Sequence, residues 1–546
     1  MPGYEDRAVA QDTAEGPGIQ ADEVTEHPSS WASSLLRRRR LLECGLAVLL
    51  GLLVLAVHDV GYLLRQSYWT DEGWVAVTTR FPLSALRATT SSTPIGWTLL
   101  VRLTTARGTE SARLLPLAFA AAAVVAAYFF ARSLGWRRTS VAVIAAALAA
   151  TGVLLVPGML VRDDLKQYTA EAFTALLTLA LTSWLERQWS LWRLAALSVS
   201  VWAGMLFSDA VAFVGLAAFA AVVVVQLATR SWRRLMQAVV AAAATGALML
   251  AVYEAFDAQA QQRLNGSAYW NGYFMPVHRG LHASLVFISR HLHKMHSYFG
   301  LGPVWLAAVL VVAGLITIAA QRRPATALAI AAVWPEMLVL SALRKYPFLD
   351  LRTSTFLIAI TVAVAAVGVV GVCLALRQWL RAGVAVLAAA ALAAFVWGAL
   401  PDVRSHRIPV EDVRQQTLYV ESHAAPGDAV VVSLASNFGF AYYWRTGNPA
   451  RRATGADREN YVAYFPGQPR IVVANSRDYA GVEAALSQAL AMARQHTCAR
   501  VWLVRTHLAS TEPAAWAKAL SQAGLPLVKV GSDGLTYLQP GGSSCG

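Results

Sequence analysis

The chain has 546 residues, of which 56% are hydrophobic and only 14% are charged. Soluble domains carry about 25% charged residues, so this composition excludes an ordinary soluble enzyme, and recurring apolar runs near the length of a bilayer span predict a polytopic helical membrane protein. The net charge of +14 does not indicate a nucleic-acid partner, because the basic residues mostly lie between the apolar runs, where topology signals and contacts with anionic membrane lipids account for them.

The first segments of the chain set its orientation in the membrane. Residues 1–36 are polar and rich in Glu, Asp, Gly and Pro, so we expect a disordered cytoplasmic tail. The run Arg37-Arg38-Arg39-Arg40 adjoins the first apolar run, residues 41–64, and arginines beside a first span place that end in the cytoplasm. The loop that follows this span therefore faces outward.

Further apolar runs complete a transmembrane region over residues 37–400, with about eleven spans. They lie near residues 112–131, 139–159, 169–186, 192–207, 211–229, 235–254, 301–320, 325–342, 354–376 and 382–400. Each connection predicted to be cytoplasmic holds a basic pair or more, which supports this topology. The outer connections are the candidate catalytic loops, at 65–111, 160–168, 255–300 and 343–353.

The composition changes after Pro401, and residues 401–546 form the last predicted domain. Short apolar runs of strand length alternate with helical stretches, which indicates a small α/β domain. The strands are expected at 429–434, 470–474, 500–506, 525–530 and 535–539, and the helices at 410–424, 480–495 and 512–523. An odd number of spans makes this domain extracytoplasmic. The sequence leaves open whether Cys498 and Cys545 form a disulfide there.

The first candidate site is the acidic pair Asp71-Glu72, which follows the first span in the segment SYWTDEGW. Two adjacent acids also suit an ordinary solvated loop or a helix N-terminus. The same outer loop holds Arg80, Arg87, Arg102 and Arg107, against the positive-inside trend, which favours a role with anions. Its stretch Pro94–Leu103 is too short to span a bilayer and predicts an interfacial amphipathic helix.

The second candidate site lies at the start of the span near 169–186. Asp163, Asp164, Lys166 and Glu171 gather where a membrane disfavours charge, and such residues at span ends are usually functional. If this stretch is helical, Asp164, Tyr168 and Glu171 share one face. Local pairing of Asp with Lys at the interface is the alternative.

The third candidate site is the basic and aromatic segment around residues 343–353. Arg344, Lys345, Tyr346 and Arg352 suit a phosphate at the headgroup level, whether of a substrate or of an ordinary lipid. The histidines of Arg290–His296 lack the i, i+4 pair of a helical zinc site. The metal ligands are therefore unknown, and no cofactor is certain, with a divalent cation as an option.

The order of these motifs resembles the GT-C superfamily of membrane glycosyltransferases. It is most similar to the branch of the dolichyl-phosphate-mannose–protein mannosyltransferases, glycosyltransferase family 39, and its bacterial relatives. The resemblance covers roughly residues 41–445 and rests on spacing rather than on one specific motif. The motifs that carry the resemblance are, in chain order, Asp71-Glu72, Thr93-Pro94, Glu110–Pro116, Asp164–Tyr168, Tyr269–Pro276 and Tyr346–Phe348 with Arg352.

The resemblance implies a GT-C-like fold and a set of site residues. Asp71 matches the family's catalytic base, with Glu72 beside it, and Asp164 matches the acid before the fourth span. Lys166 and Arg352 match phosphate contacts, and we expect Tyr168 and Tyr346 to join them. Two departures stand out: Ser92-Thr93-Pro94 replaces the family's His-Pro-Pro or Pro-Pro, and Lys166 replaces its usual arginine.

The resemblance also implies a substrate class and a location. The donor would be a sugar linked to polyprenyl phosphate, and the acceptor an envelope glycan, lipid or protein hydroxyl, transferred with inversion in a bacterial inner (plasma) membrane. A transporter or lipid-linked-sugar flippase without transferase activity is the alternative. Such a protein places its charges near the midplane on broken helices, whereas here they gather at the outer ends of the spans, apart from Glu336 after Pro335.

Overall fold

The computed structural model describes most of the chain. The described residues are 30–57, 60–86, 93–105, 110–156, 165–258, 269–299, 304–350, 352–376, 397, 412–453, 461–508, 511–530 and 535–540. The chain divides into two compact units, residues 1–46 and residues 47–546. Helix α1 (Ser30–Val57) begins in the first unit, where Arg39 and Glu43 form an exposed ion pair one turn apart. Everything described below belongs to the second unit.

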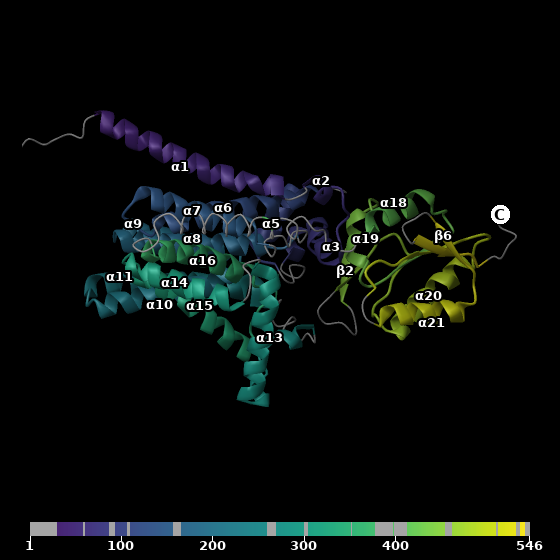
Figure 1. The fold of residues 1–546 in the computed structure, drawn as a ribbon. Helices are drawn as coiled ribbons and strands as arrows, with labels where there is room; N and C mark the ends of the chain where they lie inside the picture. The colour runs from purple at the N-terminus through teal and green to yellow at the C-terminus, as the bar shows by residue number, and fades with distance from the viewer. Residues whose placement is uncertain are drawn as a thin grey trace, which may run out of the picture. The chain divides into compact units, whose positions relative to one another are not determined.

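The centre of the second unit is a bundle of apolar helices (Figure 1). Its members are α6 (Leu114–Ser133), α7 (Thr139–Leu154), α8 (Tyr168–Arg187), α9 (Leu191–Gly204), α10 (Ala210–Ala228), α11 (Trp232–Val252), α14 (Val304–Ala320), α15 (Pro324–Ala342) and α16 (Thr355–Leu376). Small residues let some of them approach closely: a Cβ on Gly368 of α16 would lie 2.0 Å from the Leu310 carbonyl oxygen of α14. Such contacts replace the hydrophobic effect as the source of helix association in lipid.

The lengths of these helices confirm the predicted polytopic class. Among the described residues, five segments are long and apolar enough to cross a bilayer: 111–133, 210–228, 232–257, 324–342 and 355–376. Shorter apolar helices lie at 41–57, 95–104, 139–154, 191–204 and 304–320. The predicted span at 382–400 lies outside the described residues apart from Trp397.

Short helices and the longer α13 make up the described parts of the connections that the sequence predicts to face outward. The first connection holds α2 (Val60–Leu63), α3 (Thr70–Val77), η1 (Thr78–Arg80), η2 (Leu83–Ala85), α5 (Ile95–Thr104) and η3 (Ser111–Arg113). The later ones hold η5 (Tyr253–Asp257), η6 (Tyr269–Tyr273), η7 (Val277–Arg279) and α13 (Leu281–Phe299). Helix α5 confirms the helix predicted at 94–103. Its Trp97 is fully buried and donates its indole N–H to the Leu165 carbonyl at 2.9 Å.

The C-terminal part is the predicted α/β domain. It contains α18 (Val413–His423), β1 (Ala429–Val432), α19 (Asn437–Tyr443), β2 (Ala450–Ala453), β3 (Tyr461–Tyr464), β4 (Ile471–Val473), α20 (Tyr479–Ala493), β5 (Val501–Val504), α21 (Glu512–Ala523), β6 (Leu527–Val530) and β7 (Leu535–Leu538). The main sheet has the order β4-β1-β5-β7-β6. Strands β4, β1 and β5 are parallel, whereas β7 is antiparallel to both of its neighbours.

Most elements of this domain lie where the sequence predicts them, within a few residues. The five strands of the main sheet and the helices α18, α20 and α21 are confirmed. Helix α19 and the β2–β3 ribbon are additional. Cys498 is disulfide-bonded, and its suggested partner Cys545 lies outside the described residues.

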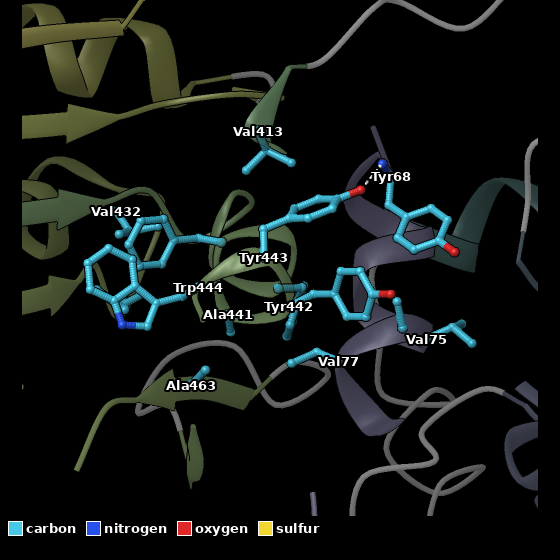
Figure 2. Packing of buried hydrophobic residues seen from close by; sticks show 14 of the residues in the cluster. Tyr68, Val75, Val77, Val413, Val432, Ala441, Tyr442, Tyr443, Trp444 and Ala463 are labelled. Carbon is cyan, nitrogen blue, oxygen red and sulfur yellow. Dashed lines mark hydrogen bonds between the residues drawn. The ribbon is translucent and has the colours of Figure 1, made fainter. Parts of the chain in front are cut away.

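One buried cluster joins the first outer connection to the C-terminal domain. Figure 2 shows Tyr442 and Tyr443 of α19 directed towards Tyr68 and α3. The Tyr443 hydroxyl accepts the Tyr68 backbone N–H at 2.8 Å. The two helices touch through backbone, because a Cβ on Gly73 of α3 would lie 2.8 Å from the Gly439 nitrogen of α19. The C-terminal domain is thus packed directly against the helix that carries the acidic pair.

Candidate active site

Helix α3 presents the acidic pair in its first turn. Asp71 and Glu72 follow Thr70, where carboxylates interact favourably with the positive end of the helix dipole. The Glu72 carboxylate also accepts the Trp69 backbone N–H at 3.3 Å, which ties the start of the helix together. The helix turns the two neighbours in different directions: Glu72 is fully buried, whereas the Asp71 side chain keeps 21% of its surface exposed.

Glu72 forms a buried ion pair with Arg113. The Arg113 Nε donates to Glu72 Oε1 at 2.8 Å, and Nη2 donates to Oε2. The same guanidinium donates to the carbonyls of Gln66 at 2.6 Å and Ser67 at 3.1 Å, and to that of Leu63. Charged groups in the interior need this full set of partners. Glu72 therefore holds α3 to the start of α6.

Asp71 faces two cations that come from distant parts of the chain. Arg352 Nη1 donates to Asp71 Oδ2 at 2.5 Å, and the Lys166 Nζ lies 3.7 Å from the same oxygen. Burial by itself raises the pKa of the Asp71 carboxyl, but Lys166 and Arg352 outweigh it and hold that pKa below its ordinary value. Asp71 is therefore a carboxylate throughout the physiological pH range.

Two tryptophans pack against these cations. The Arg352 guanidinium lies over the Trp69 ring at 5.6 Å, and the Lys166 ammonium lies over the Trp74 ring at 5.5 Å. Both rings belong to the segment that carries Asp71. Cation–π contacts of this kind fix the position of a charge and shield it from water. The result is a carboxylate and two cations in a partly dehydrated setting.

Tyr346 lies against the segment that carries Arg352, and Tyr168 is one of its electrostatic neighbours. The Tyr346 hydroxyl donates to the Thr353 carbonyl at 2.9 Å, which braces the segment that carries Arg352. Tyr168 opens α8 and is buried. Burial, and then the negative charges of Glu171 and Asp209, raise the pKa of Tyr346, so its hydroxyl stays protonated. Asp163 and Asp164 lie outside the described residues. Helix α8 begins at Tyr168, so it contains Tyr168 and Glu171 of the predicted helical face.

Asp209 is an additional polar residue near the second candidate site. It precedes α10, and the Gln167 Nε2 donates to its Oδ2 at 3.4 Å. Its signal in the sequence is an acid between two predicted spans on the outer side, the same signal that singled out Asp164. Glu171 is buried one turn into α8 and is an electrostatic neighbour of Asp209.

Hydrogen bonds link the C-terminal domain to the connection that follows the first predicted span. The Tyr443 hydroxyl donates to Glu110 Oε1 at 2.8 Å, and Arg414 Nη1 donates to Glu110 Oε2 at 2.8 Å. Arg80 donates to the backbone carbonyls at the end of α19, including Ala441 at 2.5 Å. Sequence patterns did not reveal these partners, because each pair joins residues more than 300 positions apart.

The described part of the chain does not fit a metal centre. It contains no group of three or more His, Cys, Asp or Glu side chains that could hold an ion. Asp71 is flanked by two cations, which oppose a divalent cation at the same oxygen. In the His-rich helix α13, His291 is buried against Phe287 at a ring distance of 4.0 Å and bonds the Phe287 carbonyl through Nδ1 at 2.9 Å.

Comparison with known proteins supports the fold. No protein-family model and no curated protein sequence matches the chain. Two solved structures of the oligosaccharyltransferase of the archaeon Archaeoglobus fulgidus are similar. One, a complex with Zn and sulfate, has a TM-score of 0.50 at 12% identity, over 84% of this chain and 67% of the other. The second, of the oligosaccharyltransferase AglB from the same archaeon with an inhibitory peptide and a dolichol-phosphate, has a TM-score of 0.51 at 11% identity, over 85% of this chain and 69% of the other. The protein thus shares the fold of these archaeal structures over most of its length.

Proposed function

We propose that this protein is a membrane glycosyltransferase. It moves a monosaccharide from a polyprenyl-phosphate donor to an acceptor hydroxyl on the extracytoplasmic side, with inversion at the anomeric carbon. Asp71 is the general base, and Lys166 and Arg352 bind the donor phosphate. The protein belongs, in this proposal, to a bacterial inner membrane, with its N-terminus in the cytoplasm and its C-terminal domain outside.

The convergence on Asp71 is the observation that carries the proposal. Three segments far apart in the chain bring one carboxylate and two cations together at the end of an apolar bundle. Glu72, the neighbouring acid, is already bound by Arg113. A base next to a pair of phosphate-binding cations is what transfer from a phosphate-linked sugar requires.

The chemistry is a single displacement. The acceptor oxygen attacks the anomeric carbon, its proton passes to Asp71, and the bond from the sugar to the phosphate oxygen breaks. Polyprenyl phosphate leaves with the electrons of that bond, and Lys166 and Arg352 stabilise the charge that develops on it. Two cations in a poorly hydrated site do this more effectively than water. In this scheme Asp71 accepts the proton that the acceptor loses, and Lys166 and Arg352 stabilise the charge that the leaving phosphate gains.

The lipid-linked donor is supported by the similar structures as well as by the site. The archaeal oligosaccharyltransferase has been seen with a dolichol-phosphate and with an inhibitory peptide. A lipid phosphate beside a GT-C bundle is consistent with the two cations at Asp71. For the present chain we infer the monophosphate class of donor, and as acceptor an envelope glycan, lipid or protein with a free hydroxyl.

The ion pair between Arg352 and Asp71 belongs to the state of the enzyme before the donor binds. The same guanidinium cannot give its full strength to the carboxylate and to a phosphate at once, since both compete for its N–H groups. Donor binding therefore draws Arg352 and Lys166 towards the phosphate and leaves Asp71 free to take a proton. We infer that the base becomes active only in the donor complex.

The test is transfer by the purified full-length chain in lipid nanodiscs. Radiolabelled polyprenyl-phosphate mannose, arabinofuranose, glucose and galactose are offered in turn with envelope extracts as acceptor. We expect label to move into the acceptor fraction with one donor, and Asp71→Asn to abolish the transfer. In a parallel assay with the protein in sealed proteoliposomes, movement of the donor across the membrane without any transfer would instead support a flippase. Turnover near the wild-type value in Asp71→Asn would falsify the role of Asp71.

A further inference from the structure

The C-terminal domain places a histidine beside the proposed reaction centre. His507 follows strand β5 and lies with its ring 5.7 Å from that of Trp69, in an edge-on arrangement. When it is protonated, its charge also helps to lower the pKa of Asp71, after the larger effects of Lys166 and Arg352. Ligands of α/β domains bind at the carboxyl ends of parallel strands, and here the ends of β1 and β5 face the start of α3, where Thr70 donates to the Ala435 carbonyl at 3.4 Å.

The position of His507 is fixed by its surroundings. The preceding residue, Thr506, donates its backbone N–H to the Ser436 hydroxyl oxygen at 2.7 Å, and the Ser436 hydroxyl donates back to the Thr506 carbonyl at 3.0 Å. His507 itself has φ of 53°, a left-handed conformation in which histidine is several-fold enriched among residues other than glycine. The turn aims the ring at Trp69 while the side chain remains exposed.

The proposed reaction leaves a proton on Asp71 in every cycle, and that proton must leave before the next one. Lys166 and Arg352 are already protonated, and the Trp69 indole can only donate. Glu72 is occupied by Arg113. Arg505, two residues before His507, lies over Trp516 at 5.4 Å and does not point to the centre. Among the groups that the structure describes around Asp71, an imidazole is the one that exchanges protons near neutral pH.

We propose that His507 accepts the proton from Asp71 and releases it to the solvent. This proposal rests on the transferase function proposed above and adds the C-terminal domain to its catalytic cycle. The protonated Asp71 carboxyl gives its proton to the neutral imidazole of His507, directly or through one water molecule. The carboxylate is restored, and the imidazolium then gives the proton to bulk water or buffer. No electron changes hands, and the imidazole ends each cycle as it began.

The experiment compares three substitutions at His507 in the full-length protein. His507→Gln and His507→Ala remove the proton acceptor, whereas His507→Phe keeps a ring against Trp69 without one. We expect kcat to fall at least about tenfold in all three, a modest share of what a proton-transfer group contributes. Added imidazole should restore turnover in His507→Ala. The wild-type rate should also fall on the acid side, where an imidazole becomes protonated and can no longer accept a proton, and the variants should lose that dependence.

The control is His496→Gln, because His496 is exposed in the same domain and bonds Arg470 at 2.6 Å. It should keep the wild-type turnover and pH profile. Full turnover in His507→Phe would show that the ring contact alone matters and would overturn the proposal, as would a loss that imidazole does not restore. Failure of the wild-type chain to transfer any sugar would instead overturn the proposed function itself.

Discussion

At the scale of single residues, the adjacent acids Asp71 and Glu72 have opposite environments. Glu72 is fully buried and shares two hydrogen bonds with one guanidinium, whereas Asp71 is partly exposed and uses one oxygen for two cations. The first arrangement is that of a structural ion pair, and the second is one that a ligand can rearrange. In the proposed function, Glu72 therefore serves the stability of the fold and Asp71 serves the chemistry.

This division predicts different outcomes for two conservative substitutions. Glu72→Gln leaves the buried Arg113 cation without its carboxylate and should lower the free energy of unfolding by about 3 kcal/mol or more. Asp71→Asn should lower it by less, because the Asp71 side chain keeps 21% of its surface exposed whereas Glu72 is fully buried, yet should abolish transfer. Thermal unfolding in detergent and the transfer assay measure the two effects. A large loss of stability in Asp71→Asn would contradict the assignment.

The pH dependence of the reaction follows from the cations at Asp71. They hold the pKa of that carboxyl below its ordinary value against the effect of burial. In Arg352→Gln one cation fewer opposes the effect of burial, so the pKa of Asp71 rises. The fall of kcat/KM on the acid side should therefore move to higher pH. The control is Lys518→Gln, whose ammonium lies over Tyr479 in the C-terminal domain at 4.2 Å and should leave the profile unchanged.

At the scale of elements, α3 is held in place by α19 of the C-terminal domain. The contact has no room for side chains at its centre, since Gly73 and Gly439 meet backbone to backbone. Tyr443 extends the contact by bonding Tyr68 on one side and Glu110 on the other. The orientation of Asp71 towards Lys166 and Arg352 is therefore set by both domains of the second unit.

A single methyl group should disturb this contact. In Gly73→Ala the new Cβ would lie 2.8 Å from the Gly439 nitrogen, so α3 must move away from α19, at a cost of about 1–3 kcal/mol. We expect a lower unfolding temperature and reduced transfer. The matched control is Gly246→Ala in α11, where a Cβ has no atom within 4 Å. It should be neutral or slightly stabilising, and equal losses in both variants would rule out the contact as the cause.

At the scale of the whole molecule, the transfer scheme requires the C-terminal domain and the acidic pair on one side of the membrane. In a chain with Cys44 and Cys373 replaced by Ser, the exposed Ser487 of α20 is changed to Cys. We expect a membrane-impermeant maleimide to label it in intact cells. Thr229→Cys, between α10 and α11, should be labelled only after the membrane is opened. The reverse pattern would contradict the proposed orientation.

Helices and strands with a local sequence pattern could be predicted from the sequence. Strands β1, β4 and β5 read as short buried runs between turns, and α5 as a helix too short to span, because their periodicity is local. The sequence marks Lys166 and Arg352 as charged residues of interest, but it cannot show that they meet at one oxygen of Asp71, since Arg352 lies 281 positions away. Helix α19 carries Gly439 and a run of aromatics with no helical signature, and its contact with α3 joins residues far apart in the chain. No motif or spacing in the sequence points to His507 as a residue of the site.

The competition for Arg352 has a consequence for inhibitors. A molecule that imitates only the acceptor meets an Asp71 whose oxygen is still held by Arg352 and Lys166, so it gains little from hydrogen bonding to that carboxylate. An anionic group shaped like the head of a polyprenyl phosphate would take both cations and uncover the carboxylate at the same time. Compounds against this protein should therefore combine an anion with a hydroxyl, so that one half of the ligand prepares the site for the other.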